Sequence, residues 1–392
     1  MYFESIDDKS ECIGVYHEGK LYFENFPSEL KRTWRYSGSI TDDDIEYAWL
    51  YTDGGTLAEC CPNGYVEELQ HTEQKLRAYI KTFKIAKVNL NDHCIFDLVP
   101  HDFLKRFCEV KTRITEHVFE TYEKPANYQH LCDTEKLLYK IRYNKLNLNT
   151  EDCRHLMLSS LDRTKAQELV KGYSYIDYNL FGTATGRLTT RPGSFPILTV
   201  KKEFRKLLKP NNELFVALDY NGAEIRTFLD LCGYKQPPHD IHDWNVRNVY
   251  ANSLTRDEAK IEFFAWLYNG DEKEPLSEVY DKGRLLEEWY DGEYVINPYK
   301  RKMEIDDRRA LNYLIQSTTA DRVFAKAVEI DRMLEGRKSF ISHLLHDEIV
   351  IDFHNDDRPL IKDIQNVFEG HDDYVSTIKA GKNYFELNEL KI

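Results

Sequence analysis

The sequence predicts an α+β fold in which short strands that carry acidic residues are separated by long helices. An apolar run from Leu214 to Leu218 ends at Asp219, which is the pattern of a buried strand with a polar end. Two more apolar runs flank the polar tip His346–Glu348 and read as a hairpin. Residues 256–268 and 306–335 have helical spacing instead, so strands and helices are mixed along the chain.

The first part of the chain predicts a small α/β module. Residues 12–25 read as a strand, a Glu-Gly turn and a second strand. Helical periodicity is present at 67–84, 101–123 and 134–145. The eight cysteines have no zinc-type spacing, and we expect them to be free thiols in a reducing compartment.

The charge distribution leaves the nature of the partner open. The chain has a net charge of −14, which by itself argues against nucleic acid. However, residues 1–71 hold five basic and fifteen acidic side chains, whereas residues 72–210 hold twenty-five basic and sixteen acidic ones. A basic middle part is a candidate surface for phosphates, and it is equally the pattern of solvated helices.

Nothing in the sequence indicates a membrane protein. No apolar stretch is long enough to span a bilayer, and the first residues lack the basic and apolar segments of a signal peptide. We therefore expect a cytoplasmic protein, located in the host cytoplasm if the chain is viral.

Two acidic residues and one helix face are the candidates for chemistry. Asp219 and Asp347 lie at strand ends, and carboxylates held on rigid strands can meet at one point, as a two-metal phosphoryl-transfer site requires. The helix 256–268 carries two cations and two aromatic residues at intervals of four. Each interval turns the helix by only about 40°, so all four side chains share one face. That face suits a triphosphate with a sugar and base behind it. Its members are Arg256, Lys260, Phe264 and Tyr268.

Six ordered motifs make the sequence resemble the family A DNA polymerases, the DNA polymerase I group. The resemblance covers roughly residues 180–357. The motifs are Thr-Ala-Thr-Gly-Arg187, Asp219-Tyr-Asn-Gly-Ala-Glu224-Ile-Arg226, Asp240-Ile-His242, the Arg256–Tyr268 helix, Arg308-Arg-Ala-Leu-Asn312-Tyr-Leu-Ile-Gln316 and His346-Asp347-Glu348.

The resemblance implies a right-hand architecture, in which an antiparallel palm sheet is joined to helical fingers and a thumb. On this basis residues 1–100 are expected to be the small N-terminal α/β module, of unknown role, and 101–185 the thumb and its connection to the palm. Residues 186–239 and 301–392 would form the palm, and 240–300 shortened fingers.

The resemblance also implies roles for the acidic residues and for the helix face. Asp219 and Asp347, with the backbone carbonyl of Tyr220, would bind two Mg²⁺ ions, with Mn²⁺ able to substitute. Glu348 would either assist there or support the ligands beside it. The dNTP phosphates would be bound by Arg256 and Lys260, and Lys260 would also protonate the leaving pyrophosphate.

Further residues would contact the nucleotide or the DNA. Phe264 would pack on the sugar and base of the dNTP, and His242 also belongs to the substrate-binding set. Glu224, braced by Tyr268, resembles the steric gate against ribonucleotides. Primer–template DNA would be contacted by the remaining residues, with an ordinary salt bridge as the alternative for Arg226 and Arg308. These residues are Arg187, Asn312, Gln316, His346, Arg308 and Arg226.

The sequence departs from the family in ways that favour a compact viral or phage-like member. Gly222 stands where a polar residue is usual, and the fingers are shorter than in typical members. A recognisable 3′–5′ exonuclease domain is absent, because residues 1–110 are too short for one. A processivity factor, a helicase or a separate exonuclease are therefore possible partners.

Two other functions remain as alternatives. A single-subunit RNA polymerase shares the palm, although Glu224 at the gate position argues against it. A catalytically silent, polymerase-shaped DNA-binding subunit is the second alternative, and the presence of both aspartates together with Arg256 and Lys260 argues against that.

Overall fold

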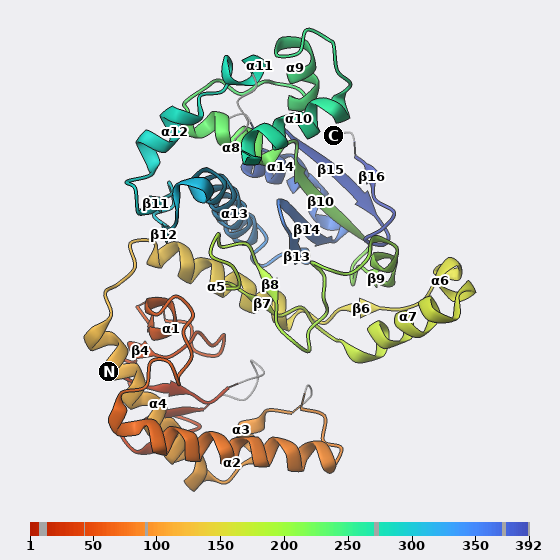
Figure 1. The fold of residues 1–392 in the computed structure, drawn as a ribbon. Helices are drawn as coiled ribbons and strands as arrows, with labels where there is room; N and C mark the ends of the chain where they lie inside the picture. The colour runs from red at the N-terminus through yellow and green to blue at the C-terminus, as the bar shows by residue number, and fades with distance from the viewer. Residues whose placement is uncertain (8–13, 43, 91–92, 270–273, 371–373, 391–392) are drawn as a thin grey trace. The chain divides into compact units, whose positions relative to one another are not determined.

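The computed structural model describes residues 1–7, 14–42, 44–90, 93–269, 274–370 and 374–390. These residues form two compact units, Met1–Tyr143 and Asn144–Ile392 (Figure 1). The boundary expected at residue 100 therefore lies inside the first unit, and residues 101–143 belong with the N-terminal module. The division of the second unit into palm, fingers and thumb stays a prediction.

The first unit combines short strands with three long helices. Strands β1, β2 and β3 form an antiparallel sheet in that order, and β4 pairs with β5 in parallel. The expected strand–turn–strand is present as β2 and β3, joined at Glu18 and Gly19, while residues 12 and 13 lie outside the described residues. The elements are β1 (Glu4–Ser5), β2 (Val15–His17), β3 (Lys20–Tyr22), β4 (Arg32–Thr33), β5 (Glu46–Tyr47), α1 (Ala48–Tyr51), η1 (Asn63–Tyr65), α2 (Val66–Ile85), α3 (Ile95–Leu98), α4 (His101–Thr121) and α5 (Tyr128–Tyr143).

Helix α4 packs against other elements of the first unit. Its residues Phe103, Leu104 and Cys108 pack in one apolar cluster, with Leu76 and Tyr79 of α2 against them. This packing is the reason that the segment belongs to the N-terminal unit, because the apolar face of an amphipathic helix must be buried against a neighbour. The helices expected at 67–84 and 101–123 are thus confirmed. Helix α5 begins six residues earlier than expected, at Tyr128.

Seven of the eight cysteines lie within the described residues, which leave out Cys12, and six of the seven are free thiols as expected. Cys60, Cys61, Cys108, Cys132, Cys153 and Cys232 are free thiols. Cys94 is disulfide-bonded, so the expectation of free thiols is wrong at this position.

A five-stranded antiparallel sheet is the framework of the second unit. Its order is β13-β14-β10-β15-β16, so strands that are distant in sequence become neighbours (Figure 1). In the register of the central strand β10, Asp219 lies opposite Glu348 of β14 and opposite Thr377 of β15. Successive side chains of a strand alternate between the two faces of a sheet, so these three residues share one face.

The other elements of the second unit surround this sheet. Helix α13 packs against α8 and α14, and α14 contacts β10 and β15. The elements are β6 (Asn147–Leu148), α6 (Arg154–Leu158), α7 (Ser160–Gly172), β7 (Tyr178–Asn179), β8 (Thr189–Thr190), η2 (Lys202–Leu207), β9 (Leu208–Lys209), β10 (Leu214–Tyr220), α8 (Ala223–Leu231), α9 (Ile241–Asn248), α10 (Arg256–Asn269), α11 (Glu274–Ser277), α12 (Lys282–Trp289), β11 (Tyr294–Ile296), β12 (Lys302–Glu304), α13 (Asp307–Met333), β13 (Phe340–Leu345), β14 (Glu348–Phe353), η3 (Asn355–Leu360), α14 (Ile361–Glu369), β15 (Ser376–Gly381) and β16 (Asn388–Glu389).

A second apolar core connects helices α8 to α13. Phe228 of α8, Phe263 and Trp266 of α10 and Tyr280 are fully buried in it and make edge-to-face or tilted ring contacts. Aromatic pairs in these geometries add to the stabilisation from buried area. The core therefore holds α8 and α10, which carry predicted site residues, in fixed positions. Among the described residues, none of the helices combines the length and the apolar character needed to cross a bilayer.

Candidate active site

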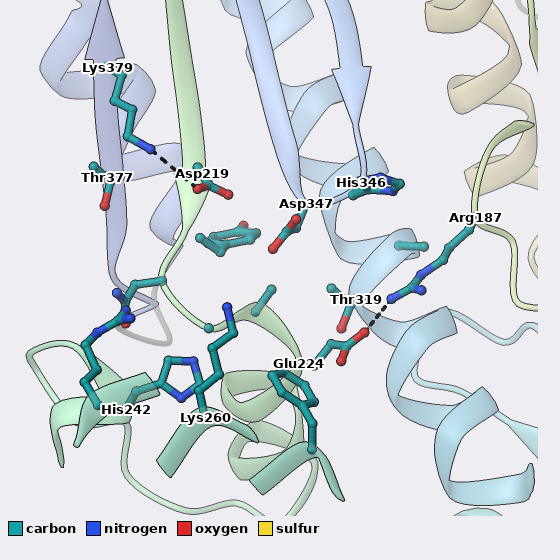
Figure 2. A pocket seen from close by; sticks show the side chains of 17 residues that line it. Arg187, Asp219, Glu224, His242, Lys260, Thr319, His346, Asp347, Thr377 and Lys379 are labelled. Atoms are coloured by element: carbon teal, nitrogen blue, oxygen red, sulfur yellow. Dashed lines mark hydrogen bonds and ion pairs between the residues drawn. The ribbon is translucent and has the colours of Figure 1, made fainter. Parts of the chain in front are cut away.

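The second unit contains a cleft of about 470 Å³ at one end of the five-stranded sheet (Figure 2). The cleft is bounded by the end of β10, the start of α8, helices α9, α10 and α13, the β13–β14 turn and strand β15. Most of the predicted site residues line it. They are Arg187, Asp219, Tyr220, Glu224, His242, Arg256, Lys260, Phe264, His346 and Asp347.

Asp219 and Asp347 extend into the same space from two neighbouring strand ends (Figure 2). Burial and, to a smaller extent, the negative charge of Asp347 raise the pKa of Asp219 to about 6. Burial also raises the pKa of Asp347 above its usual range. Two partly buried carboxylates that oppose each other's ionisation favour a bound cation.

Glu348 lies beside this pair but does not line the cleft. Its carboxylate accepts a hydrogen bond of 2.8 Å from the Tyr384 hydroxyl. Burial raises the pKa of Glu348 to about 7, and the charge of Asp219 contributes. The geometry therefore places Glu348 next to Asp219 in the sheet, with its side chain already occupied by Tyr384.

The turn that carries Asp347 has an unusual backbone. His346 has a φ of +56°, in the left-handed region that a residue with a side chain adopts at some cost. The tight turn directs Asp347 into the cleft and also keeps His346 at its edge (Figure 2).

Tyr220 fixes the end of strand β10 from the face of the sheet opposite the Asp219 side chain. Its ring stacks on Phe368 with centroids 3.9 Å apart, and its hydroxyl donates a 2.5 Å hydrogen bond to the Phe368 carbonyl. Asp219 is the adjacent residue, so its backbone is held by a buried aromatic contact on the opposite face of the sheet.

Gly222 allows α8 to begin directly after the strand. Its φ is +68°, and a Cβ at this position would lie 2.4 Å from Cγ2 of Ile241. Glycine is therefore favoured at this position, because any side chain would meet both the backbone preference and Ile241. The sharp turn brings Glu224, in the first turn of α8, to the wall of the cleft.

Helix α10 begins with the predicted capping box. The Thr255 hydroxyl and backbone amide both donate to the Glu258 carboxylate at 2.8 Å, and the Glu258 amide donates back to the Thr255 hydroxyl. Arg256 donates a 2.7 Å hydrogen bond to Asp240, whose own carboxylate caps α9. Asp240 therefore holds the Arg256 guanidinium at the cleft wall, and Lys260 follows one turn later (Figure 2).

Glu224 is held by two partners. The Tyr268 hydroxyl donates to Oε2 at 2.5 Å, and the Arg187 guanidinium forms an ion pair with Oε1 (Figure 2). Tyr268 stacks on Phe264 in turn, with ring centroids 6.0 Å apart. The carboxylate of Glu224 is thus fixed in position, and Arg187 is turned toward it.

His242 lies in the cleft wall as a neutral imidazole. Burial lowers its pKa to about 4, against the opposing effect of Asp240. Its Nδ1 is buried and has no hydrogen-bond partner among the described residues. The ring centroid is 6.3 Å from that of Phe264, so His242 adds a polar edge to the aromatic side of the cleft.

The structure does not bring every predicted residue to the cleft. Arg226 is completely buried, and its guanidinium donates to the carbonyls of Asn221, Pro237 and His239, so it clamps a loop instead of facing DNA. Arg308 is exposed in the first turn of α13, away from the cleft lining. For both residues the role of an ordinary structural or surface residue fits the geometry better.

Asn312 and Gln316 lie on α13, N-terminal to the part of this helix that lines the cleft. Gln316 interacts with the Tyr268 hydroxyl. The Asn312 Oδ1 is buried and accepts no hydrogen bond within the described part of the chain. Their proposed contacts with the minor groove stay a prediction.

Seven residues that line the cleft are not among the predicted site residues, and three of them, Asn221, Gly222 and Ala223, follow directly after strand β10. Thr319 and Ala320 come from α13, and Thr377 and Lys379 from β15. Lys379 and Thr377 are spaced by two, as residues on one strand face are, but the sequence does not reveal which strand pairs with β10. The pairing with Asp219 could be known only from the folded sheet.

The donor set of the cleft fits Mg²⁺. Within the described residues, no group of three or more His, Cys, Asp or Glu side chains is arranged to hold a metal ion. The cleft instead offers two partly buried, mutually repelling carboxylates, and Mg²⁺ is usually held by one or two carboxylates while substrate phosphates and water complete its coordination. The cations Arg256 and Lys260 on the facing helix suit such phosphates.

Comparison with known proteins identifies the fold. No protein-family model matches the sequence, and no curated protein matches it significantly. Among solved structures, the chain is similar to the POL domain of Pol1 from M. smegmatis in complex with DNA primer-template and dNTP. The TM-score is 0.54 at 12% sequence identity, over 72% of this chain and 75% of that chain. The chain therefore has a polymerase-domain fold, which confirms the fold class in its coarse form.

Proposed function

We propose that this chain is a DNA-directed DNA polymerase of the family A type, which extends a primer 3′ end with dNTPs and releases pyrophosphate. The observation that carries the proposal is the single cleft in which Asp219 and Asp347 face Arg256 and Lys260. The polymerase-domain fold and the six ordered sequence motifs support the same conclusion.

The acidic pair would hold the metal. Asp219, Asp347 and the backbone carbonyl of Tyr220 are the proposed ligands of two Mg²⁺ ions, with Mn²⁺ as a substitute. When bound, these ions would lower the pKa of the primer 3′-hydroxyl and neutralise charge on the triphosphate.

The residues of helix α10 would position the nucleotide. In the reaction the primer 3′-oxygen forms a bond to the α-phosphorus while the bond between this phosphorus and the pyrophosphate oxygen breaks. Arg256 and Lys260 bind the negatively charged phosphates, and Lys260 donates a proton to the leaving pyrophosphate. Asp240 orients Arg256 for this task through their 2.7 Å hydrogen bond.

The aromatic side of the cleft would select the sugar. Phe264 packs against the sugar and base, next to His242. Glu224 occupies the space that a ribose 2′-hydroxyl would need, and the Tyr268 hydroxyl keeps it there. Arg187, Asn312, Gln316 and His346 are the proposed contacts with primer–template DNA.

Primer extension with Mg²⁺ is the direct test. Asp219→Ala and Asp347→Ala should each abolish extension while primer–template affinity changes by only a few-fold, because these changes remove metal ligands and leave the DNA-binding surface. Glu348→Ala should cost less. Asp363→Ala is a matched control, since Asp363 is exposed on α14 outside the cleft.

Three results would contradict the proposal. Extension by Asp219→Ala at the wild-type rate would refute the site, and wild-type protein that binds primer–template without extending it would favour the catalytically silent subunit. Preference for rNTPs over dNTPs would favour the RNA polymerase.

A further inference from the structure

Strand β15 brings an unassigned cation to the cleft. In the sheet register Thr377 lies opposite Asp219 and Lys379 lies opposite Ala217, so both side chains are on the Asp219 face. The Lys379 ammonium is 4.0 Å from Oδ2 of Asp219 and is directed at it (Figure 2). Both Lys379 and Thr377 line the cleft.

This ion pair contributes little to the stability of the fold. The Lys379 side chain is 40% exposed and that of Asp219 is 39% exposed, and ion pairs open to solvent contribute little to folding. The position of the ion pair points to a functional role instead, because three carboxylates lie at this end of the sheet. Asp219 and Glu348 are direct neighbours in the register, and Asp347 is next to Glu348 in the chain.

The cations near Asp219 have different surroundings. Lys260 approaches from helix α10 and lies with Arg256 on the face assigned to the phosphates. Lys379 approaches from the sheet, on the strand beside Asp219. It is therefore placed to act on the carboxylate itself.

We propose that Lys379 is a positioning residue that serves as the built-in counterion of Asp219 and thereby sets the divalent-cation affinity of the site. The inference rests on the proposed function, because it takes Asp219 as a metal ligand. Without a cation, the ammonium holds the carboxylate in one place. A divalent cation that binds Asp219 is repelled by the ammonium, so binding stays weak until the phosphates of a nucleotide supply further negative charge.

Mn²⁺ binding to the full chain, measured by electron paramagnetic resonance without DNA or nucleotide, tests this role. Lys379→Met keeps the length of the side chain and removes its charge, so Mn²⁺ should bind about 5- to 10-fold more tightly, as expected for a charge a few ångströms away in a well-screened site. Lys379→Arg keeps the charge and should retain the wild-type affinity. Lys382→Met is the matched control, because Lys382 is exposed and outside the cleft lining, and it should change nothing.

Unchanged or weaker Mn²⁺ binding by Lys379→Met would overturn the inference, as would the absence of Mn²⁺ binding by both the wild type and Lys379→Met. Weaker dNTP binding with unchanged Mn²⁺ affinity would also overturn it, because Lys379 would then be a phosphate contact. Should Lys379→Met not fold, Lys379→Gln gives the same readout. The measurement needs no polymerisation, so wild-type protein that binds Mn²⁺ without extending a primer refutes the proposed function alone.

Discussion

Glu224 illustrates how single residues in this cleft depend on their partners. Its carboxylate is fixed by the Tyr268 hydroxyl and by Arg187. The sequence suggests only the contact with Tyr268. A residue that excludes a 2′-hydroxyl by its volume must not move, and two partners make movement less favourable.

Changes at Glu224 should therefore alter sugar selection. Glu224→Gln keeps the volume and an acceptor for Tyr268, so it should retain most discrimination. Glu224→Gly should reduce the ratio of dNTP to rNTP efficiency by about 10- to 100-fold, because the pocket can no longer reject the extra hydroxyl. Single-turnover incorporation of matched dNTP and rNTP checks this. The same ratio in wild type and Glu224→Gly would make Glu224 a structural residue only.

His343 is a buried histidine on the same sheet. It is fully buried next to Tyr384, with ring centroids 4.5 Å apart. Burial lowers its pKa to about 3, with a smaller contribution from the charge of Arg205. The unfolded chain therefore takes up a proton near the usual pKa of histidine, whereas the folded protein does so only in stronger acid.

This difference predicts a loss of stability in acid. Below about pH 6.5 the unfolded state binds the proton and the folded state does not, so stability falls toward low pH by up to about 1.4 kcal/mol per pH unit from this one group. His343→Gln lacks this contribution. The gap between the urea-unfolding free energies of wild type and variant should thus shrink, or reverse, as the pH falls from 7 to 4.5. If the unfolding free energies of the two proteins changed in parallel with pH, folding would not lower the pKa of His343.

At the scale of elements, the turn between β10 and α8 depends both on backbone conformation and on side-chain packing. Gly222 and Gly233 flank α8 and both have a φ of +68°. A Cβ at Gly233 would meet no atom within 4 Å, whereas one at Gly222 would meet Ile241 at 2.4 Å. The two glycines thus separate the cost of backbone conformation from the cost of crowding.

Alanine at each position measures these costs. Gly233→Ala should lower the free energy of unfolding by about 1 kcal/mol, the cost of a left-handed alanine. Gly222→Ala should cost about 1–3 kcal/mol more, because Ile241 has to move. It should also slow extension, since Asp219 and Glu224 lie on either side of the turn. Denaturant unfolding of the two variants checks this, and equal losses would mean that Ile241 yields freely.

At the scale of the whole molecule, net charge is a poor guide to the partner. The chain has a net charge of −14, yet residues 72–210 have an excess of basic side chains. Binding to DNA depends on the local cations that replace counterions at the phosphates, and not on the net charge.

Primer–template binding should accordingly weaken with salt. Between 50 and 200 mM NaCl we expect affinity to fall roughly 10- to 500-fold for two to five phosphate contacts. Replacing the exposed Lys201 and Lys202 by alanine should make this dependence less steep, while Lys382→Ala outside the basic segment should not. Fluorescence anisotropy over a salt series measures the slope. Affinity independent of salt would exclude this segment as the phosphate surface.

The sequence alone determined the parts of the molecule whose signals are local. The capping box of α10, the face shared by Arg256, Lys260 and Phe264, and the polar hairpin tip at Asp347 follow from spacings of a few residues, which helix and strand geometry converts directly into positions. Ordered motifs then indicated a polymerase fold, which the structural likeness confirms.

The tertiary structure decided whatever depends on contacts between distant segments. It placed α4 in the N-terminal unit, buried Arg226 behind a loop, turned Arg187 toward Glu224 and set Lys379 beside Asp219. None of these can be read from spacing, because the order of strands in a sheet and the partner of a long cationic side chain depend on which surfaces pack together.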